Sequence, residues 1–167
     1  MAVKVWNVGD VLTAADMNAW TVPLAAYRTT TQSVTSSTTL QNDNALSVAV
    51  AANAVYIVEL ALIYDADTAG DLKLGWTIPA GASITNVADS MLTGTAAATT
   101  DDQMTAGTTN PIAGGLGSGT NCGFVGKWLL TISSTSGTLQ LQWAQGTSSA
   151  TATRLFAGSY LLAQRVG

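Results

Sequence analysis

Acidic side chains are the residues of this chain whose spacing could most readily support chemistry. Asp65, Asp67 and Asp71 surround a short polar stretch, and a glycine stands at its sixth position. A calcium-binding loop begins in the same way, with carboxylates at positions one and three and glycine at position six. Here position five is Ala69 and position twelve is Trp76, so the third ligand and the bidentate glutamate are missing. We therefore interpret the stretch as a hairpin loop and predict no metal site.

A second possible chemistry is the hydrolysis of a glycosidic bond by two carboxylates. Glu59 lies in a strongly apolar stretch, where catalytic acids are often found, and Asp101 is followed directly by Asp102. The alternative for Glu59 is an ion pair with Arg154 or Arg165 at a subunit interface. We favour the ion pair, because no other feature of the sequence supports a glycosidase.

The composition argues against nucleophilic and zinc-dependent catalysis. The chain has no histidine, which excludes Ser–His and Cys–His pairs and the usual zinc sites. Its one cysteine, Cys122, stands among glycine and asparagine with no base beside it. The glycine-rich run from Gly114 to Gly119 is not followed by Lys-Ser or Lys-Thr, as a phosphate-binding loop would be. We predict no catalytic residue, no cofactor and no enzymatic activity.

Charge and hydropathy restrict the possible partners. The formal charge is −4, the pI is about 4.3 and the six cations are scattered along the chain, which argues against nucleic-acid binding. The sequence contains no apolar window of about 18 residues and no signal-peptide pattern at its start. We expect no membrane partner, and a protein that is made and kept in a cytoplasm or leaves it by lysis. Only 10% of the residues are charged, a composition typical of all-β virion or extracellular proteins.

The elements that must position these side chains are β-strands, and the most distinctive runs from Ala54 to Asp65. It is rich in β-branched and aromatic residues and contains neither glycine nor proline. One face carries Tyr56, Val58, Leu60, Leu62 and Tyr64, and the other carries Val55, Ile57, Glu59, Ala61 and Ile63. A strand with one wet face alternates apolar and polar side chains, but here both faces are apolar except at Glu59. The second face is therefore covered by another layer of the chain or by a neighbouring subunit. We predict a trimer with Val55, Ile57, Glu59 and Ile63 at the subunit contact.

Alternating side chains and turn residues predict nine strands from Thr30 onward. They span Thr30–Thr35, Ala45–Ala51, Ala54–Asp65, Leu72–Ile78, Ser83–Ala88, Val125–Ser133, Thr138–Ala144, Thr151–Phe156 and Ser159–Val166. Short strands at regular spacing favour a sandwich, and this number in about 140 residues fits an all-β jelly roll. In its pattern of strands, this part of the chain resembles jelly rolls of the TNF-like type. We expect a core that includes Tyr56, Leu60, Leu62, Trp76, Leu141 and Trp143.

The first 29 residues differ from the rest, and we predict a separate anchor segment before a jelly-roll domain of residues 30–167. Thr13 and Asp16 have the spacing of a capping box, and Pro23 stops a helix, so we expect a short helix over Ala14–Thr21. Four large apolar residues are too many for a free tail: Trp6, Leu12, Met17 and Trp20. They pack either on the chain's own β domain or on another protein, and we predict that they attach the protein to a partner.

The stretch from Thr93 to Gly123 interrupts the regular strands. It is rich in threonine, alanine and glycine and shows one possible short strand near Gln103–Thr105. Structureless segments of this length are unusual inside compact domains. We predict a loop that contacts a partner or carries function.

The segment from Val5 to Trp20 reads Val-Trp-Asn-Val-Gly-Asp-Val-Leu-Thr-Ala-Ala-Asp-Met-Asn-Ala-Trp. This segment resembles the start of many small virion proteins of tailed bacteriophages, usually described as minor tail or tail-fibre proteins. The end of the chain, from Gly158 to Val166, resembles the last strand of such proteins. The resemblance implies a structural role among other virion proteins and supplies no catalytic residues.

We therefore expect a non-enzymatic structural protein of a tailed-phage virion, assembled in the host cytoplasm. It would be a trimeric surface appendage attached through its N-terminal segment. The first alternative is a capsid decoration protein of the same build. The second is a carbohydrate-binding receptor module that uses tryptophan and aspartate side chains on its loops to bind a host-surface glycan, and the third is a glycan-cleaving enzyme.

Overall fold

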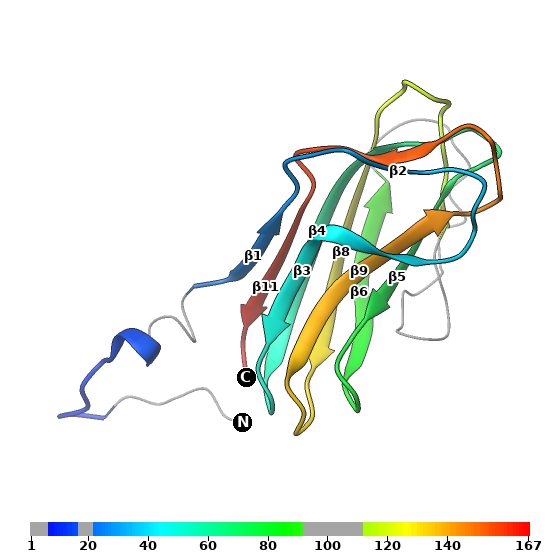
Figure 1. The fold of residues 1–167 in the computed structure, drawn as a ribbon. Coiled ribbons are helices and arrows are strands. Elements are labelled where there is room, and N and C mark those ends of the chain that lie inside the picture. Colours follow the sequence, from blue (N-terminus) through cyan, green and yellow to red (C-terminus); the bar gives the residue numbers. More distant parts are fainter. Residues whose placement is uncertain (1–6, 17–21, 92–111) are drawn as a thin grey trace.

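Two antiparallel β-sheets pack face to face in the computed structural model of the chain (Figure 1), which describes residues 7–16, 22–91 and 112–167. Successive strands repeatedly cross from one sheet to the other, as β3, β4 and β5 do. The predicted all-β jelly-roll sandwich is confirmed. Among the described residues, no helix is long and apolar enough to cross a membrane.

The larger sheet contains seven strands within the described ranges, and β4 (Val55–Asp65) lies at its centre. One edge of β4 pairs with β8 (Cys122–Thr131), which pairs in turn with β6 (Ser83–Met91). The other edge pairs first with β11 (Tyr160–Arg165) and then with β10 (Thr153–Leu155). β1 (Leu24–Tyr27) extends the sheet beyond β11, and β2 (Gln32–Val34) extends it beyond β10.

The smaller sheet has four strands within the described ranges. Their order is β3 (Gln41–Val50), β9 (Gly137–Gln145), β5 (Leu72–Thr77) and β7 (Ile112–Ala113). Each of the nine predicted strands overlaps one observed strand, and the ends differ by a few residues. Two strands, β1 and β7, were not predicted. Both are short, and β1 has the sequence Leu-Ala-Ala-Tyr, whose two alanines have little preference for a strand.

The core lies between the sheets and is built from alternate residues of their long strands. On β4, Tyr56, Leu60 and Leu62 are buried, as predicted, and so are Val58 and Tyr64. The predicted core residues Trp76, Leu141 and Trp143 are also buried. Burial of every second side chain along these strands stabilises the sandwich, because each large apolar side chain contributes about 1.5–3 kcal/mol when it leaves water.

Aromatic rings fill the space between β5 and β8. The rings of Trp76 and Trp128 meet edge to face, with centroids 5.3 Å apart, and Phe124 stacks beside Trp128 at 6.4 Å. A β-carbon on Gly126 would overlap the indole of Trp128, so this position has no room for a side chain. The glycine in the middle of β8 is therefore explained by the packing of the large ring two residues later.

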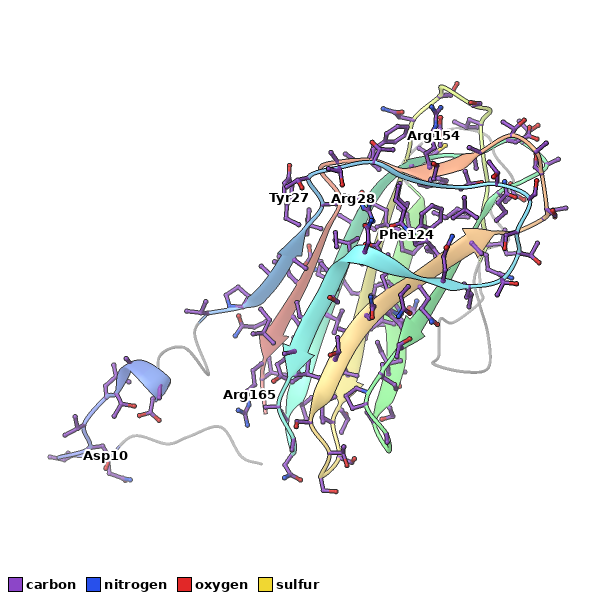
Figure 2. All side chains as sticks on the ribbon, in the orientation of Figure 1. Asp10, Tyr27, Arg28, Phe124, Arg154 and Arg165 are labelled. Atoms are coloured by element: carbon purple, nitrogen blue, oxygen red, sulfur yellow. The ribbon has the colours of Figure 1, made fainter. Side chains whose placement is uncertain are left out.

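An ion pair between Arg28 and Asp43 joins β3 to the chain that follows β1 (Figure 2). Both side chains are fully buried. The other Asp43 oxygen, Oδ1, accepts hydrogen bonds from the backbone N–H groups of Ala45 (2.8 Å) and Leu46 (2.7 Å), where the register of β3 shifts. The N–H of Arg28 also donates to the carbonyl of Ser159 at 2.9 Å. β1 thus belongs to the larger sheet and Arg28 is buried beside it, although the sequence pattern assigns both to the N-terminal segment.

Residues 7–16 of the N-terminal segment lie apart from the sandwich (Figure 1). A helical turn begins at Ala14, and Thr13 and Asp16 form the predicted capping box. The N–H of Asp16 donates to Thr13 Oγ1 at 3.1 Å, and the N–H of Thr13 donates to Asp16 Oδ2 at 3.3 Å. The remainder of the predicted helix, residues 17–21, lies outside the described residues.

Candidate interaction surfaces

The three aspartates that suggest a calcium loop are directed at three different partners. Asp65 forms a bidentate ion pair with Arg154, in which Nε donates to Oδ1 at 2.9 Å. Asp67 accepts a hydrogen bond from the hydroxyl of Ser149 at 3.0 Å. Asp71 accepts one from the N–H of Gly115 at 2.9 Å. Within the described ranges, no group of three or more His, Cys, Asp or Glu side chains converges as metal ligands do.

The described part of the glycine-rich run packs on this aspartate loop. The backbone of Gly115 lies so close to the carbonyl oxygen of Ala66 that a β-carbon there would overlap it. The N–H of Gly117 donates to the same carbonyl at 2.9 Å, and the N–H of Gly119 donates to Asp65 at 2.7 Å. The close contact explains the glycine at position 115, whereas Gly117 and Gly119 have positive φ angles of 107° and 88°, which favour glycine. Residues 92–111 of the predicted partner-contacting loop, including Gln103–Thr105, lie outside the described residues.

Tyr64 is a buried ionisable group of the inner face, and its environment opposes ionisation. Its hydroxyl donates a hydrogen bond to the carbonyl of Gly114 at 2.7 Å. Burial raises the pKa of the Tyr64 phenol above its ordinary value, and the nearby Cys122 and Asp71 add to the effect. The phenol therefore stays protonated and acts as a structural hydrogen-bond donor.

Within the chain, Glu59 pairs with Lys127 and not with Arg154 or Arg165, and a pair with either arginine across a subunit contact stays a prediction. Glu59 on β4 lies directly opposite Lys127 on β8, and Lys127 Nζ is 3.4 Å from Glu59 Oε2. Arg154 is instead bound to Asp65, and the Nε of Arg165 donates to the carbonyl of Gly167 at 3.1 Å. Strand register decides the partner here, because side chains directly across an antiparallel pair are the nearest neighbours.

Large apolar side chains extend over the outer face of the seven-stranded sheet. Ile57 on β4 lies opposite Leu129 on β8, and their side chains are 46% and 42% exposed. Tyr27 on β1 is 62% exposed and points away from the sandwich (Figure 2). We define the large outer face by outward residues of β1, β4, β8 and β11, with the Glu59–Lys127 pair among them. The apolar ones include Tyr27, Val55, Ile57, Ala61, Ile63, Val125, Leu129, Tyr160 and Leu162, and the uncharged polar ones are Thr131 and Gln164. Of the predicted subunit-contact residues, Ile57 and Ile63 are exposed, and Val55 and Glu59 are half-buried.

The outer face of the four-stranded sheet has the opposite character. We define the small outer face by Ser47, Lys73, Thr77, Thr138, Gln140 and Gln142, which point away from the core on β3, β5 and β9. Its amides bond within the sheet: Gln142 Nε2 donates to Asn42 Oδ1 at 2.9 Å, and Gln140 Nε2 donates to the carbonyl of Asp43 at 2.8 Å. This polar surface suits contact with water.

Exposed apolar side chains also occur in the described part of the N-terminal segment. Leu12 is 54% exposed, and Val8 and Val11 are more exposed still. Trp6, Met17 and Trp20, the other predicted attachment residues, lie outside the described residues.

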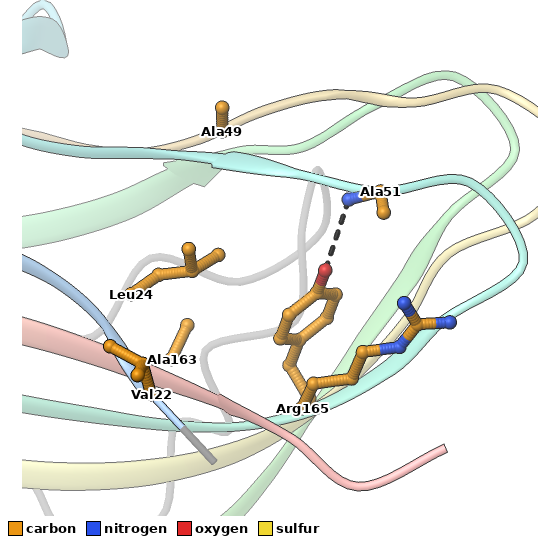
Figure 3. Close-up of a pocket in the computed structure, with 7 residues that line it drawn as sticks. Val22, Leu24, Ala49, Ala51, Ala163 and Arg165 are labelled. Carbon is orange, nitrogen blue, oxygen red and sulfur yellow. Dashed lines mark hydrogen bonds between the residues drawn. The ribbon is translucent and has the colours of Figure 1, made fainter. Parts of the chain in front are cut away.

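A pocket opens at the edge of the sandwich, between β1 and β3 (Figure 3). Its volume is about 200 Å³. The N–H of Ala51 donates a 3.0 Å hydrogen bond to the hydroxyl oxygen of Tyr56 in the wall. The lining comes from Val22, Leu24, Ala49, Ala51, Tyr56, Ala163 and Arg165. No local pattern in the sequence indicates this pocket, because its residues come from four separate segments.

No family model matches this sequence, and no curated protein matches it. Among solved structures, the chain is similar to the tripod from the baseplate of bacteriophage Tuc2009, with 10% sequence identity and a TM-score of 0.41. That alignment covers 98% of this chain and 75% of the tripod chain. A second similar structure is that of the infectious bursal disease virus Gx strain, with 14% identity, a TM-score of 0.22 and coverage of 98% of this chain and 44% of the other. Both similarities are too low to assign a function to this chain.

Proposed function

We propose that this chain is a non-enzymatic structural protein of a tailed-bacteriophage particle. In this proposal it forms a trimeric appendage of the minor tail or fibre type and is attached through its N-terminal segment. The observation that carries the structural role is the large outer face. The phage assignment follows from the resemblance of the segment from Val5 to Trp20 to the start of phage virion proteins.

The large outer face supports association between copies. An antiparallel sheet with one wet face places polar side chains outward, as the small outer face does. The large outer face instead exposes Ile57, Ile63 and Leu129 around one ion pair, Glu59–Lys127. Exposed apolar surfaces that are continuous over several strands mark interaction sites. In the proposed trimer, Val55, Ile57, Glu59 and Ile63 lie at the subunit contact together with Leu129.

The N-terminal segment supports attachment. Its helical turn is capped at a defined residue, Thr13, yet so short a helix gains its stability from a surface on which it packs. Leu12 is exposed in the isolated chain and is available for such packing. Together with Trp6, Met17 and Trp20 it would bind another protein of the particle or a neighbouring copy. Since β1 belongs to the sandwich, the attachment segment in this proposal ends before Leu24.

A capsid decoration protein of the same build is the second candidate, because an apolar sheet face and an apolar N-terminal segment could bind capsid proteins in the same way.

The carbohydrate-binding alternative has lost its main support. It places tryptophans on loops, whereas Trp76, Trp128 and Trp143, the tryptophans among the described residues, are all buried in the core.

Two measurements test the proposal. Light scattering on the full chain at micromolar concentration should give the mass of a trimer, and a monomer would contradict the oligomeric part. A density map of the intact particle should then contain the jelly roll, on the tail for an appendage and on the head for a decoration protein. Absence of the chain from purified particles would contradict the structural role itself.

A further inference from the structure

The pocket between β1 and β3 lies where the N-terminal segment leaves the sandwich. Val22, one of its lining residues, precedes β1 by two positions, and Leu24 is the first residue of that strand. The opposite wall comes from Ala49 and Ala51 near the end of β3. The pocket is therefore continuous with the proposed attachment segment (Figure 3).

The lining favours an apolar side chain next to an acidic group. Three alanines leave the space open, and Val22 and Leu24 contribute apolar surface. The polar Tyr56 hydroxyl in the wall is already bonded to the N–H of Ala51. An apolar cavity of about 150 Å³ is large enough to bind benzene, so the 200 Å³ here can admit a leucine side chain. Arg165 also lines the pocket, and its positively charged guanidinium donates from Nε to the carbonyl of Gly167 at 3.1 Å.

The described part of the N-terminal segment has the matching chemistry. Leu12 is 54% exposed, and its neighbours Asp10 and Asp16 are acidic. Residues 7–16 contain no lysine or arginine. An apolar side chain between two carboxylates thus complements an apolar pocket with a guanidinium in its lining.

We propose that Leu12 of one copy docks in the β1–β3 pocket of a neighbouring copy, with the carboxylate of Asp10 or Asp16 facing Arg165. The neighbour is favoured over the same chain because the described segment extends away from its own sandwich (Figure 1). Leu12 and Val22 are ten positions apart, and an extended chain of that length spans at most about 35 Å. A head-to-tail contact of this kind closes into a ring when repeated around a symmetry axis. The inference rests on the proposed trimer and names the partner of one attachment residue.

Disulfide trapping tests this contact in the full chain. Cys122 is the one native cysteine and is buried, and it is replaced by alanine so that only introduced thiols react. Leu12→Cys and Ala51→Cys are then made in separate proteins and mixed, so that any bond must join two chains. Both positions are exposed, and the substitutions should leave the fold intact. The matched control is Val8→Cys, on the same segment and fully exposed.

We expect the Leu12→Cys and Ala51→Cys proteins to form a two-chain band on a non-reducing gel about tenfold faster than the Val8→Cys control, because docking raises the effective concentration of the two thiols. Arg165→Glu should remove that advantage. Equal rates for Leu12→Cys and Val8→Cys would overturn the docking. In a double Leu12→Cys/Ala51→Cys chain, a bond within one chain would also overturn it, because the segment would then occupy its own pocket. A trimer by light scattering that gives no specific bond refutes only this contact, whereas a monomer refutes the proposed trimer as well.

Discussion

The two sheets of the sandwich have similar inner faces and different outer faces. Both inner faces are lined by buried leucines and aromatic rings, such as Leu60 and Trp143. Outside, the small sheet presents Gln140 and Gln142, whose amides bond within the sheet, whereas the large sheet presents Ile57 and its neighbours. Since one chain makes both faces, the difference supports the proposal that the large outer face binds a protein partner while the small one contacts water.

The comparison also explains the low charge of the chain. The small outer face is polar mainly through uncharged amides and hydroxyls. On the large outer face, the charges come as the opposed pair Glu59 and Lys127, which lie 3.4 Å apart. A face whose central charges neutralise each other can be covered at a lower desolvation cost than one with isolated charges.

The largest expected change is in stability, and it distinguishes the buried inner face of β4 from its outer face. Leu60 is fully buried, so Leu60→Ala should lower the free energy of unfolding by about 2–5 kcal/mol, through lost transfer energy and a cavity. Ile57→Ala, three positions earlier on the outer face, should cost clearly less in urea titrations of dilute protein. Equal losses for the two variants would mean that the faces of β4 are assigned wrongly.

The second largest expected change is in trimer association, and it distinguishes the large outer face from the small outer face. Leu129→Asp should place a charge in the proposed subunit contact and weaken association by about 3–5 kcal/mol, or more than a hundredfold, because a buried unpaired charge is costly. Gln142→Asp on the small outer face is the control and should leave the mass in sedimentation velocity unchanged. If both variants remain trimeric, the large outer face is not the contact.

A smaller effect concerns the polar group on the inner face. Tyr64→Phe should cost about 1 kcal/mol at neutral pH through the hydrogen bond lost to Gly114. Above pH 10 the unfolded phenol, with its ordinary pKa of 10.0, loses its proton, while burial keeps the folded phenol protonated. The unfolded state then binds fewer protons, so the stability of the parent protein falls as the pH rises. The difference in stability between the parent protein and Tyr64→Phe should therefore become smaller between pH 9 and pH 11 in thermal melts. A difference that stays constant over this range would contradict the raised pKa of Tyr64.

The smallest effect concerns the ion pair on the large outer face. Glu59 and Lys127 are both partly exposed, so Glu59→Gln should change monomer stability by less than about 1 kcal/mol. The change in trimer affinity should be larger than the change in monomer stability, because the substitution leaves Lys127 without its partner in a buried contact. Chemical denaturation at two protein concentrations separates the two quantities.

The sequence by itself determined the features that depend on short-range patterns. Alternation along the chain placed nine strands, the inner face of β4 and the buried rings Trp76 and Trp143, because side chains of a strand point to opposite faces in turn. The spacing of Thr13 and Asp16 predicted their reciprocal hydrogen bonds, because residues three positions apart meet at the first turn of a helix. The apolar second face of β4 could likewise be read from the order of its residues.

Only the tertiary structure decided which distant residues meet. Asp65 and Arg154 are 89 positions apart, and Arg28 and Asp43 are 15 apart, so neither pair has a local signal. Within the chain, strand register gave Glu59 a lysine as its partner, whereas the sequence suggested an arginine at a subunit contact. The sequence did not predict β1, because this strand forms through backbone pairing with β11 and its own composition has no strand pattern. Contacts of this kind depend on how the sheets assemble, and a pattern that extends over a few neighbouring residues contains no information about them.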